Sequence, residues 1–214
     1  MHNIIFFFWY KIPRLILILF LPLSFIFYII IYLRRFLLLH YFKRHTSKAR
    51  VIIVGNLVVG GSGKTPFTIW LSKYLESKDK RTTIISSGYG STISSPMIID
   101  SLSNPNEVGD EAVLLSNKTQ STVVSSSNRV ESTKFCDTSE VDFIIHDDGL
   151  QHYSLNRQYE FIIENINKRD NNFLLPCGPF REPKFFHKNA DFILSNYTGS
   201  EYPGFYSSIS GCLI

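Results

Sequence analysis

The sequence has few cysteines and few charges, and its first quarter has no acidic residue. Cys136, Cys177 and Cys212 are an odd number of cysteines without a C-x-x-C spacing, so neither a zinc site nor a disulfide framework is indicated. Charged residues are only 19% and hydrophobic residues 44% of the 214 residues. This composition excludes a disordered chain and predicts one domain, or slightly more, with a buried core.

The absence of Asp and Glu from the first 50 residues divides the chain into two parts. Residues 1–50 carry eight Lys or Arg and no Asp or Glu, whereas the other 164 residues carry 14 basic and 18 acidic residues. A basic, aromatic and apolar head on a mildly acidic body argues against a nucleic-acid binder and for contact with a membrane. We therefore expect a membrane-associated segment at residues 1–48 and a globular domain at residues 49–214.

Residues 15–33 form an uncharged run of 19, long enough for a helix that nearly crosses a bilayer. Pro22 is expected to kink this helix. Two basic residues precede the run and six follow it before Val51, which predicts that the body lies in the cytoplasm. A true span and a helix lying in the interface both remain open. A buried core helix is a third reading, which the absence of an equally apolar partner segment disfavours.

The next motif combines a strand, a glycine loop and a helix. The β-branched run at residues 51–54 predicts a buried strand, and residues 67–75 have helical spacing of apolar side chains. Between them GGSGKT matches the end of the phosphate-loop pattern, although Val58 replaces its first glycine. In such loops backbone N–H groups surround phosphates, the lysine reaches the outer phosphates and the hydroxyl can ligate magnesium. The predicted phosphate-binding residues are Gly60, Gly61, Ser62, Gly63, Lys64 and Thr65. A chance glycine turn is the alternative.

A second buried strand, within residues 141–149, ends in Asp147 and Asp148. At the carboxyl end of a parallel strand, such a pair predicts a magnesium site beside the loop, and a simple turn is the alternative. Further strands are expected within residues 82–90 and 122–124, a helix within residues 106–116 and a surface excursion at residues 91–106. The alternation predicts an α/β fold, a P-loop NTPase-like doubly wound and mostly parallel sheet preceded by an N-terminal hydrophobic membrane helix.

At this point the chain resembles the tetraacyldisaccharide 4'-kinase (lipid A 4'-kinase) family. The blocks that carry the resemblance are VGNLVVGGSGKTP (54–66), SGYG (87–90), VGDEAVLL (108–115), DDGLQHYSLNR (147–157), LLPCGPFREP (174–183) and ADFILSN (190–196). The resemblance implies transfer of the ATP γ-phosphate to the 4'-hydroxyl of a glycolipid substrate, tetraacyldisaccharide 1-phosphate. The product would be the 1,4'-bisphosphate of lipid A biosynthesis. It also implies the cytoplasmic face of the bacterial inner membrane as the location.

The resemblance also implies roles for individual residues. Asp110 would be the general base, with Lys64 and Asp148 as further catalytic residues. ATP and Mg²⁺ would be the cofactors, with the metal bound by Thr65, Asp147 and Asp148. Further candidate site residues are Gln151, His152, Arg181 and Glu182. For Asp110, the alternative is a helix N-cap.

The chain departs from the family pattern at three places. Ser87 replaces an arginine that is usual before GYG, and residues 167–172 replace a glycine-rich stretch. Family members continue beyond the position of Ile214 with a portion that supplies a histidine partner to the catalytic aspartate. We therefore expect a C-terminally truncated chain, a fragment or a copy of reduced activity. A nucleotide-binding remnant and a membrane-anchored P-loop ATPase switch are the alternative functions.

Overall fold

The computed structural model describes residues 9, 14–87, 95–138, 140–165, 171–188, 190–197 and 204–207. The strands are β1 (Arg50–Gly55), β2 (Thr82–Ser86), β3 (Met97–Ile99), β4 (Thr122–Ser125), β5 (Phe143–Asp147), β6 (Tyr159–Asn165), β7 (Phe192–Tyr197) and β8 (Gly204–Ser207). In the described part of the chain they form one eight-stranded sheet, in the order β3-β4-β2-β5-β1-β6-β7-β8. The six central strands are parallel, and β3 and β8 are antiparallel edges. The predicted mostly parallel α/β fold is confirmed.

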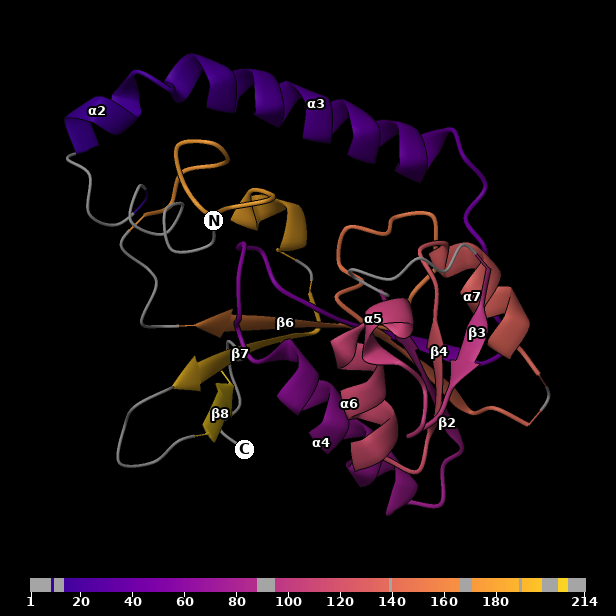
Figure 1. Ribbon diagram of the computed structural model, residues 1–214. Coiled ribbons are helices and arrows are strands. Elements are labelled where there is room, and N and C mark those ends of the chain that lie inside the picture. Colours follow the sequence, from indigo (N-terminus) through magenta and orange to yellow (C-terminus); the bar gives the residue numbers. More distant parts are fainter. Residues whose placement is uncertain are drawn as a thin grey trace.

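Helices cover both faces of this sheet (Figure 1). The described helices of the body are α4 (Lys64–Glu76), α5 (Pro105–Val108), α6 (Asp110–Lys118), α7 (Arg129–Cys136) and the 3-10 helix η2 (Lys184–His187). Alternate side chains of β1 take part in two cores: Ile52 and Val54 pack with α4 and α6, whereas Val51 and Ile53 belong to the core on the other face. Because β1 is buried on both faces, its sequence is a continuous apolar run rather than an alternating one.

The N-terminal apolar run forms two helices, α2 (Arg14–Ile18) and α3 (Leu21–His40), so the prediction of one helix at residues 15–33 is wrong in its bounds. Pro22 lies in the first turn of α3, where a missing N–H costs no hydrogen bond, and it therefore begins a helix instead of kinking one. The helix continues past Arg34 and Arg35 because no helix-breaking residue follows them. Its 20 residues are long and apolar enough to cross a membrane by length and composition.

One side of α3 packs on the body and the other is open. Ser24 and Ile31 are buried, whereas large apolar side chains such as Phe25, Ile29 and Leu33 are exposed. In Figure 1 the helix runs lengthwise over the top of the molecule instead of projecting from it. A helix with this asymmetry presents an apolar stripe outward along its whole length.

Other elements differ from the expectations in detail. The surface excursion expected at residues 91–106 contains β3 and the beginning of α5, and residues 91–94 lie outside the described residues. The glycine turn at residues 88–90 also lies outside them. The remaining expected elements form where the sequence places them: β2, α6, β4 and β5. The division of the chain at residue 48 stays a prediction.

Candidate active site

The glycine loop connects β1 to α4, as the motif predicts. Gly60 and Gly63 have φ of 105° and 92°, a left-handed conformation that glycine adopts without steric strain. Gly63 is the N-cap of α4, so the helix begins with Lys64 and its N-terminus faces the loop. The Asn56 amide donates to the carbonyl of Gly60 at 3.2 Å and holds the turn closed. The loop therefore has the backbone arrangement that an anion-binding loop needs.

The two aspartates lie beside this loop. Asp147 ends β5, which pairs with β1, and its carboxylate accepts hydrogen bonds from the Thr65 and Thr68 hydroxyls, each at 3.1 Å. Asp148 has a φ of 53°, which directs it away from the strand. Its carboxylate lies 3.6 Å from Lys64 Nζ and 3.2 Å from Arg181 Nη1. The structure thus brings the predicted lysine, threonine and aspartates together.

The two neighbouring carboxyls have opposite pKa shifts. Burial raises the pKa of Asp147, the charge of Asp148 adds to this, and Lys64 opposes it. Burial also acts to raise the pKa of Asp148, but Lys64 and Arg181 outweigh it and hold the pKa below its ordinary value. Burial lowers the pKa of Arg129 to about 10, so this guanidinium stays charged at neutral pH behind the pair. Such opposed shifts in one cluster are typical of functional sites.

The loop residues fit a phosphate chain and its metal. The buried Ser62 Oγ and Asn56 Oδ1 have no hydrogen-bond partner among the described residues. A Cβ built on Gly61 would meet no described atom within 4 Å, so there is open space beside the loop backbone. Polar atoms that are buried without a partner are rare, and a bound ligand is one way to satisfy them. Thr65 and Asp147 supply hard oxygen ligands of the type that Mg²⁺ prefers.

Three other predicted residues have different surroundings. Asp110 is the exposed first residue of α6; Gly109 is the N-cap, so the alternative reading of Asp110 as a capping residue is wrong. Its side chain makes no hydrogen bond or ion pair with the described residues. The Gln151 amide donates to the carbonyl of Asn56 at 3.3 Å, next to the loop. Burial, with the charge of Arg129, lowers the pKa of His152 to about 4, so this ring is neutral at pH 7.

Glu182 lies in a buried network and makes no described contact with the loop. Its carboxylate accepts a hydrogen bond from the Tyr153 hydroxyl at 2.6 Å and lies 2.8 Å from His187 Nε2. His187 Nδ1 lies 2.6 Å from a carboxylate oxygen of Glu160. Burial acts to lower the pKa of His187, but the two carboxylates outweigh it and raise the pKa above its ordinary value. The adjacent Arg181 contacts Asp148. Of these two predicted residues, Arg181 therefore belongs to the site and Glu182 to the core.

Sequence reasoning missed two charged residues of the site. Arg129, 3% exposed, donates to the carbonyls of Ile85 at 2.6 Å and Asp147 at 2.5 Å and ties the ends of β2 and β5 together. Burial and the charge of Asp147 raise the pKa of Glu111, which follows Asp110. A single arginine at the start of a helix carries no local signal, and Asp110 was a stronger candidate than the neighbouring Glu111.

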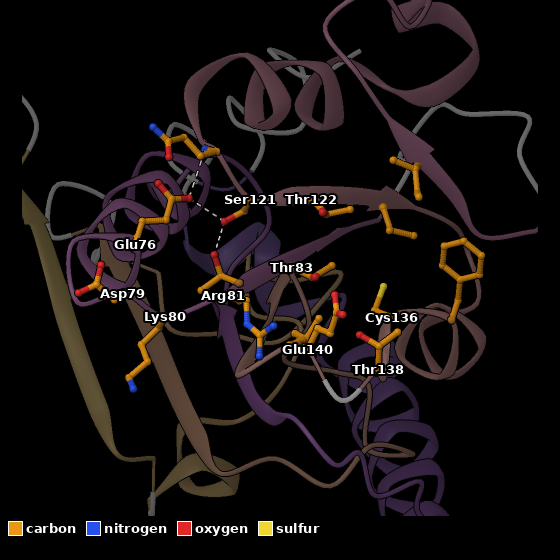
Figure 2. A pocket seen from close by; sticks show the side chains of 16 residues that line it. Glu76, Asp79, Lys80, Arg81, Thr83, Ser121, Thr122, Cys136, Thr138 and Glu140 are labelled. Atoms are coloured by element: carbon orange, nitrogen blue, oxygen red, sulfur yellow. Dashed lines mark hydrogen bonds between the residues drawn. The ribbon is translucent and has the colours of Figure 1, made fainter.

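A cavity of about 620 Å³ lies at the opposite, amino-terminal edge of the sheet (Figure 2). It is lined by the end of α4, the starts of β2 and β4 and the end of α7. Three hydroxyls beside it are paired: Glu76 Oε1 accepts hydrogen bonds from the Ser72 and Ser121 hydroxyls, and the Thr82 and Ser121 hydroxyls bond to each other. Ligands of parallel α/β sheets bind at the carboxyl ends of the strands, so this cavity is on the wrong edge for the predicted chemistry.

A lysine and a threonine at the start of a helix, beside an aspartate pair on the neighbouring parallel strand, define a P-loop protein with a phosphate-binding site. Comparison with known proteins narrows this class. The model of the LpxK family, described as tetraacyldisaccharide-1-P 4'-kinase, matches residues 16–207. The chain belongs to this family, which confirms the resemblance seen in the sequence.

Curated relatives agree with this assignment. The chain is 40% identical over 200 residues to the tetraacyldisaccharide 4'-kinase of Pasteurella multocida, covering 91% of this chain and 61% of the relative. It is 39% identical over 199 residues to that of Haemophilus influenzae, covering 91% and 60%. The chain thus spans about 60% of the length of these relatives.

A solved structure agrees as well. The crystal structure of LpxK from Aquifex aeolicus in complex with ATP is similar with a TM-score of 0.78 and 31% identity. The match covers 90% of this chain and 62% of that chain.

Proposed function

We propose that the chain transfers the γ-phosphate of ATP to the 4'-hydroxyl of a tetraacyldisaccharide 1-phosphate. The observation that carries the proposal is the cluster of Lys64, Thr65, Asp147 and Asp148 at the loop, with 3.1 to 3.6 Å between its charged and polar atoms. The ATP complex of the similar Aquifex aeolicus structure supports ATP as the donor. Phosphoryl transfer needs mainly positioning and neutralisation of charge, and this cluster supplies both.

Each residue of the cluster has a proposed part. Loop amides and the α4 N-terminus bind the phosphates, and Lys64 leaves Asp148 to neutralise the outer phosphate oxygens. Arg181 stays on Asp148 and keeps this carboxylate ionised. When bound, Mg²⁺ would neutralise charge on the outer phosphates, and Thr65 and Asp147 are the residues that would hold it.

Asp110 is the proposed general base for the sugar hydroxyl. It follows Gly109 (φ 93°), and Val108 before it is held by the Ser125 hydroxyl, which donates to the Val108 carbonyl at 3.0 Å. Ser125 ends β4, so this turn lies at the same carboxyl edge as the loop. Since Asp110 is exposed and unpaired among the described residues, its carboxylate is available to an incoming hydroxyl.

The membrane is the proposed source of the acceptor. The exposed apolar face of α3, with basic residues at its C-terminal end and no acidic residue in the first 50 positions, suits a helix in the interface of an anionic bilayer. A groove of about 420 Å³ between α3 and η2 combines rings such as Phe36 and Phe186 with the cations Arg35 and Lys188. We propose the cytoplasmic face of the bacterial inner membrane as the location.

An assay of the chain with ATP, Mg²⁺ and the acylated disaccharide monophosphate in mixed micelles tests the proposal. Formation of the 1,4'-bisphosphate is the expected result. Lipid-independent ATP hydrolysis would instead indicate a switch ATPase, and nucleotide binding without turnover would indicate a remnant.

Asp110→Asn tests the assignment of the base, and Glu107→Gln, at an exposed carboxylate of α5, is the comparison. We expect Asp110→Asn to lower kcat by about 10²- to 10⁴-fold with little change in the KM for ATP. Equal losses in both variants would contradict a specific role for Asp110.

A further inference from the structure

The first half of the phosphate loop pairs with a distant compact loop, residues 173–181, which folds back on itself through a parallel bridge between Leu174 and Phe180 and is called the hairpin here. Val58 forms an antiparallel bridge with Phe180, and the Val59 N–H donates to the carbonyl of Pro179 at 2.8 Å. The Arg181 N–H donates to the carbonyl of Leu57, also at 2.8 Å. The hairpin therefore fixes the backbone of the loop at the position where the standard pattern has a glycine.

The hairpin has a well-defined shape. The Leu175 N–H donates to the carbonyl of Phe180 at 3.0 Å, and the Gly178 N–H donates to the carbonyl of Leu174 at 3.0 Å. A Cβ on Gly178 would lie 2.3 Å from the carbonyl oxygen of Phe173, so only glycine fits. A segment folded this tightly can transmit a displacement from one end to the other.

The other side of the hairpin is attached to the N-terminal helices. The Ser24 hydroxyl of α3 donates to the carbonyl of Leu174 at 3.0 Å and accepts from the N–H of Cys177 at 3.2 Å. The Cys177 thiol donates to the carbonyl of Leu17 in α2 at 3.1 Å. Ser24 is 6% exposed and Cys177 is fully buried, so water does not replace these bonds.

A second connection runs from α3 to the beginning of the loop. Arg34 Nη2 lies 3.4 Å from the carbonyl oxygen of Gln151, to which it donates, and the Gln151 amide donates to the carbonyl of Asn56 at 3.3 Å. The helix thus reaches the loop at residue 56 through Gln151 and at residues 57–59 through the hairpin.

We propose that Ser24 and Cys177 are positioning residues for the phosphate loop, and that α3 acts through the hairpin to set nucleotide affinity. The inference rests on the nucleotide-binding part of the proposed function. Loop amides bind phosphate well only when they are held in place before the ligand arrives. The hairpin that pairs with the phosphate loop is anchored on α3. The packing of α3 on the body therefore orders the loop.

Nucleotide binding by the 214-residue chain in micelles, measured with a fluorescent ATP analogue and Mg²⁺, tests this coupling. Ser24→Ala and Cys177→Ala should each raise the Kd by roughly fivefold, the low end of coupling between sites. Cys177→Ser keeps the donor to Leu17 and should bind nearly as the parent does. Leu23→Ala, on the exposed side of α3, should leave the Kd unchanged while weakening binding to anionic vesicles.

Hydrogen exchange separates positioning from a general loss of stability. In Ser24→Ala, the amides of residues 57–63 should exchange faster while those of β4 stay as protected as in the parent chain. Unchanged exchange and affinity at the loop, with protection lost only in the hairpin, would overturn the inference. Neither the affinity nor the exchange measurement needs the lipid substrate. A chain that binds nucleotide but does not phosphorylate the lipid would contradict the proposed reaction, and the coupling between α3 and the loop could still be measured in it.

Discussion

The two edges of the parallel sheet differ in how their polar groups are satisfied. At the carboxyl edge, Asp147 and Arg129 are buried, Asp148 is partly buried, and Ser62 Oγ has no partner among the described residues. At the amino edge, the cavity of Figure 2 has exposed charges and paired hydroxyls. The cavity volume of about 620 Å³ at the amino edge therefore says little about function. The contacts of Asp147 and Asp148 with Thr65, Lys64 and Arg181, together with the opposed pKa shifts of the two carboxyls, mark the site instead.

Removing the charge at the loop should give the largest effect on nucleotide binding. Lys64→Ala deletes the cation proposed to neutralise the outer phosphates, and we expect nucleotide affinity to fall roughly 100-fold. Lys73→Ala, on the exposed side of the same helix, is the matched control. Equilibrium binding of a fluorescent ATP analogue measures both, and similar affinities for the two variants would remove the distinction between the edges.

Removing the buried arginine should lower stability. Arg129→Met leaves the carbonyls of Ile85 and Asp147 without their donors, and we expect the free energy of unfolding to fall by about 3 kcal/mol. Lys134→Met on the exposed side of α7 should change it by less than about 0.5 kcal/mol. Urea denaturation followed by circular dichroism measures the difference. A small loss in Arg129→Met would mean that the guanidinium does not hold the two strand ends together.

Titrating the buried network should give a smaller, pH-dependent effect. The pKa of His187 is raised in the fold, so its protonated form stabilises the protein below pH 6.5, and this stability is lost as the pH rises through the folded pKa. We expect His187→Gln to lower the free energy of unfolding by about 2 kcal/mol at pH 6 and by less at pH 9. Urea melts at the two pH values check this, and a loss that is equal at both would show that His187 acts without its charge.

Changing charges at the amino edge should have the smallest effect. Lys80→Ala and Glu140→Gln alter exposed side chains around the cavity, and we expect less than a twofold change in nucleotide affinity. The same binding measurement applies. A tenfold change would show that the two edges are coupled and that the cavity takes part in the function.

The parts of the site that the sequence predicts are those with local patterns. The strand before the loop, the glycines, Lys64, Thr65 and the acid pair each follow from neighbouring residues and from the rule that parallel strands share a carboxyl edge. The bounds of α3 were less predictable, because Pro22 begins a helix as readily as it bends one.

The parts that the sequence does not predict depend on contacts between distant segments. Glu182 looked like a site residue, yet Tyr153, Glu160 and His187 from other segments enclose it in the core. Arg129 became part of the site because α7 places it under two strand ends. Periodicity and spacing in the sequence do not predict contacts between distant segments, because such contacts depend on the tertiary fold.

The bond between Val59 and Pro179 has a consequence for protein synthesis. When residues 60–65 have just been synthesised, the segment that aligns their backbone does not yet exist. The residues between this motif and Pro179, which make up more than half of the chain, must be translated first. The proposed nucleotide site would therefore be completed late in synthesis, long after α3 has been made. With α3 in the proposed contact with a bilayer, a nascent chain would reach the membrane before the backbone of its phosphate loop is aligned.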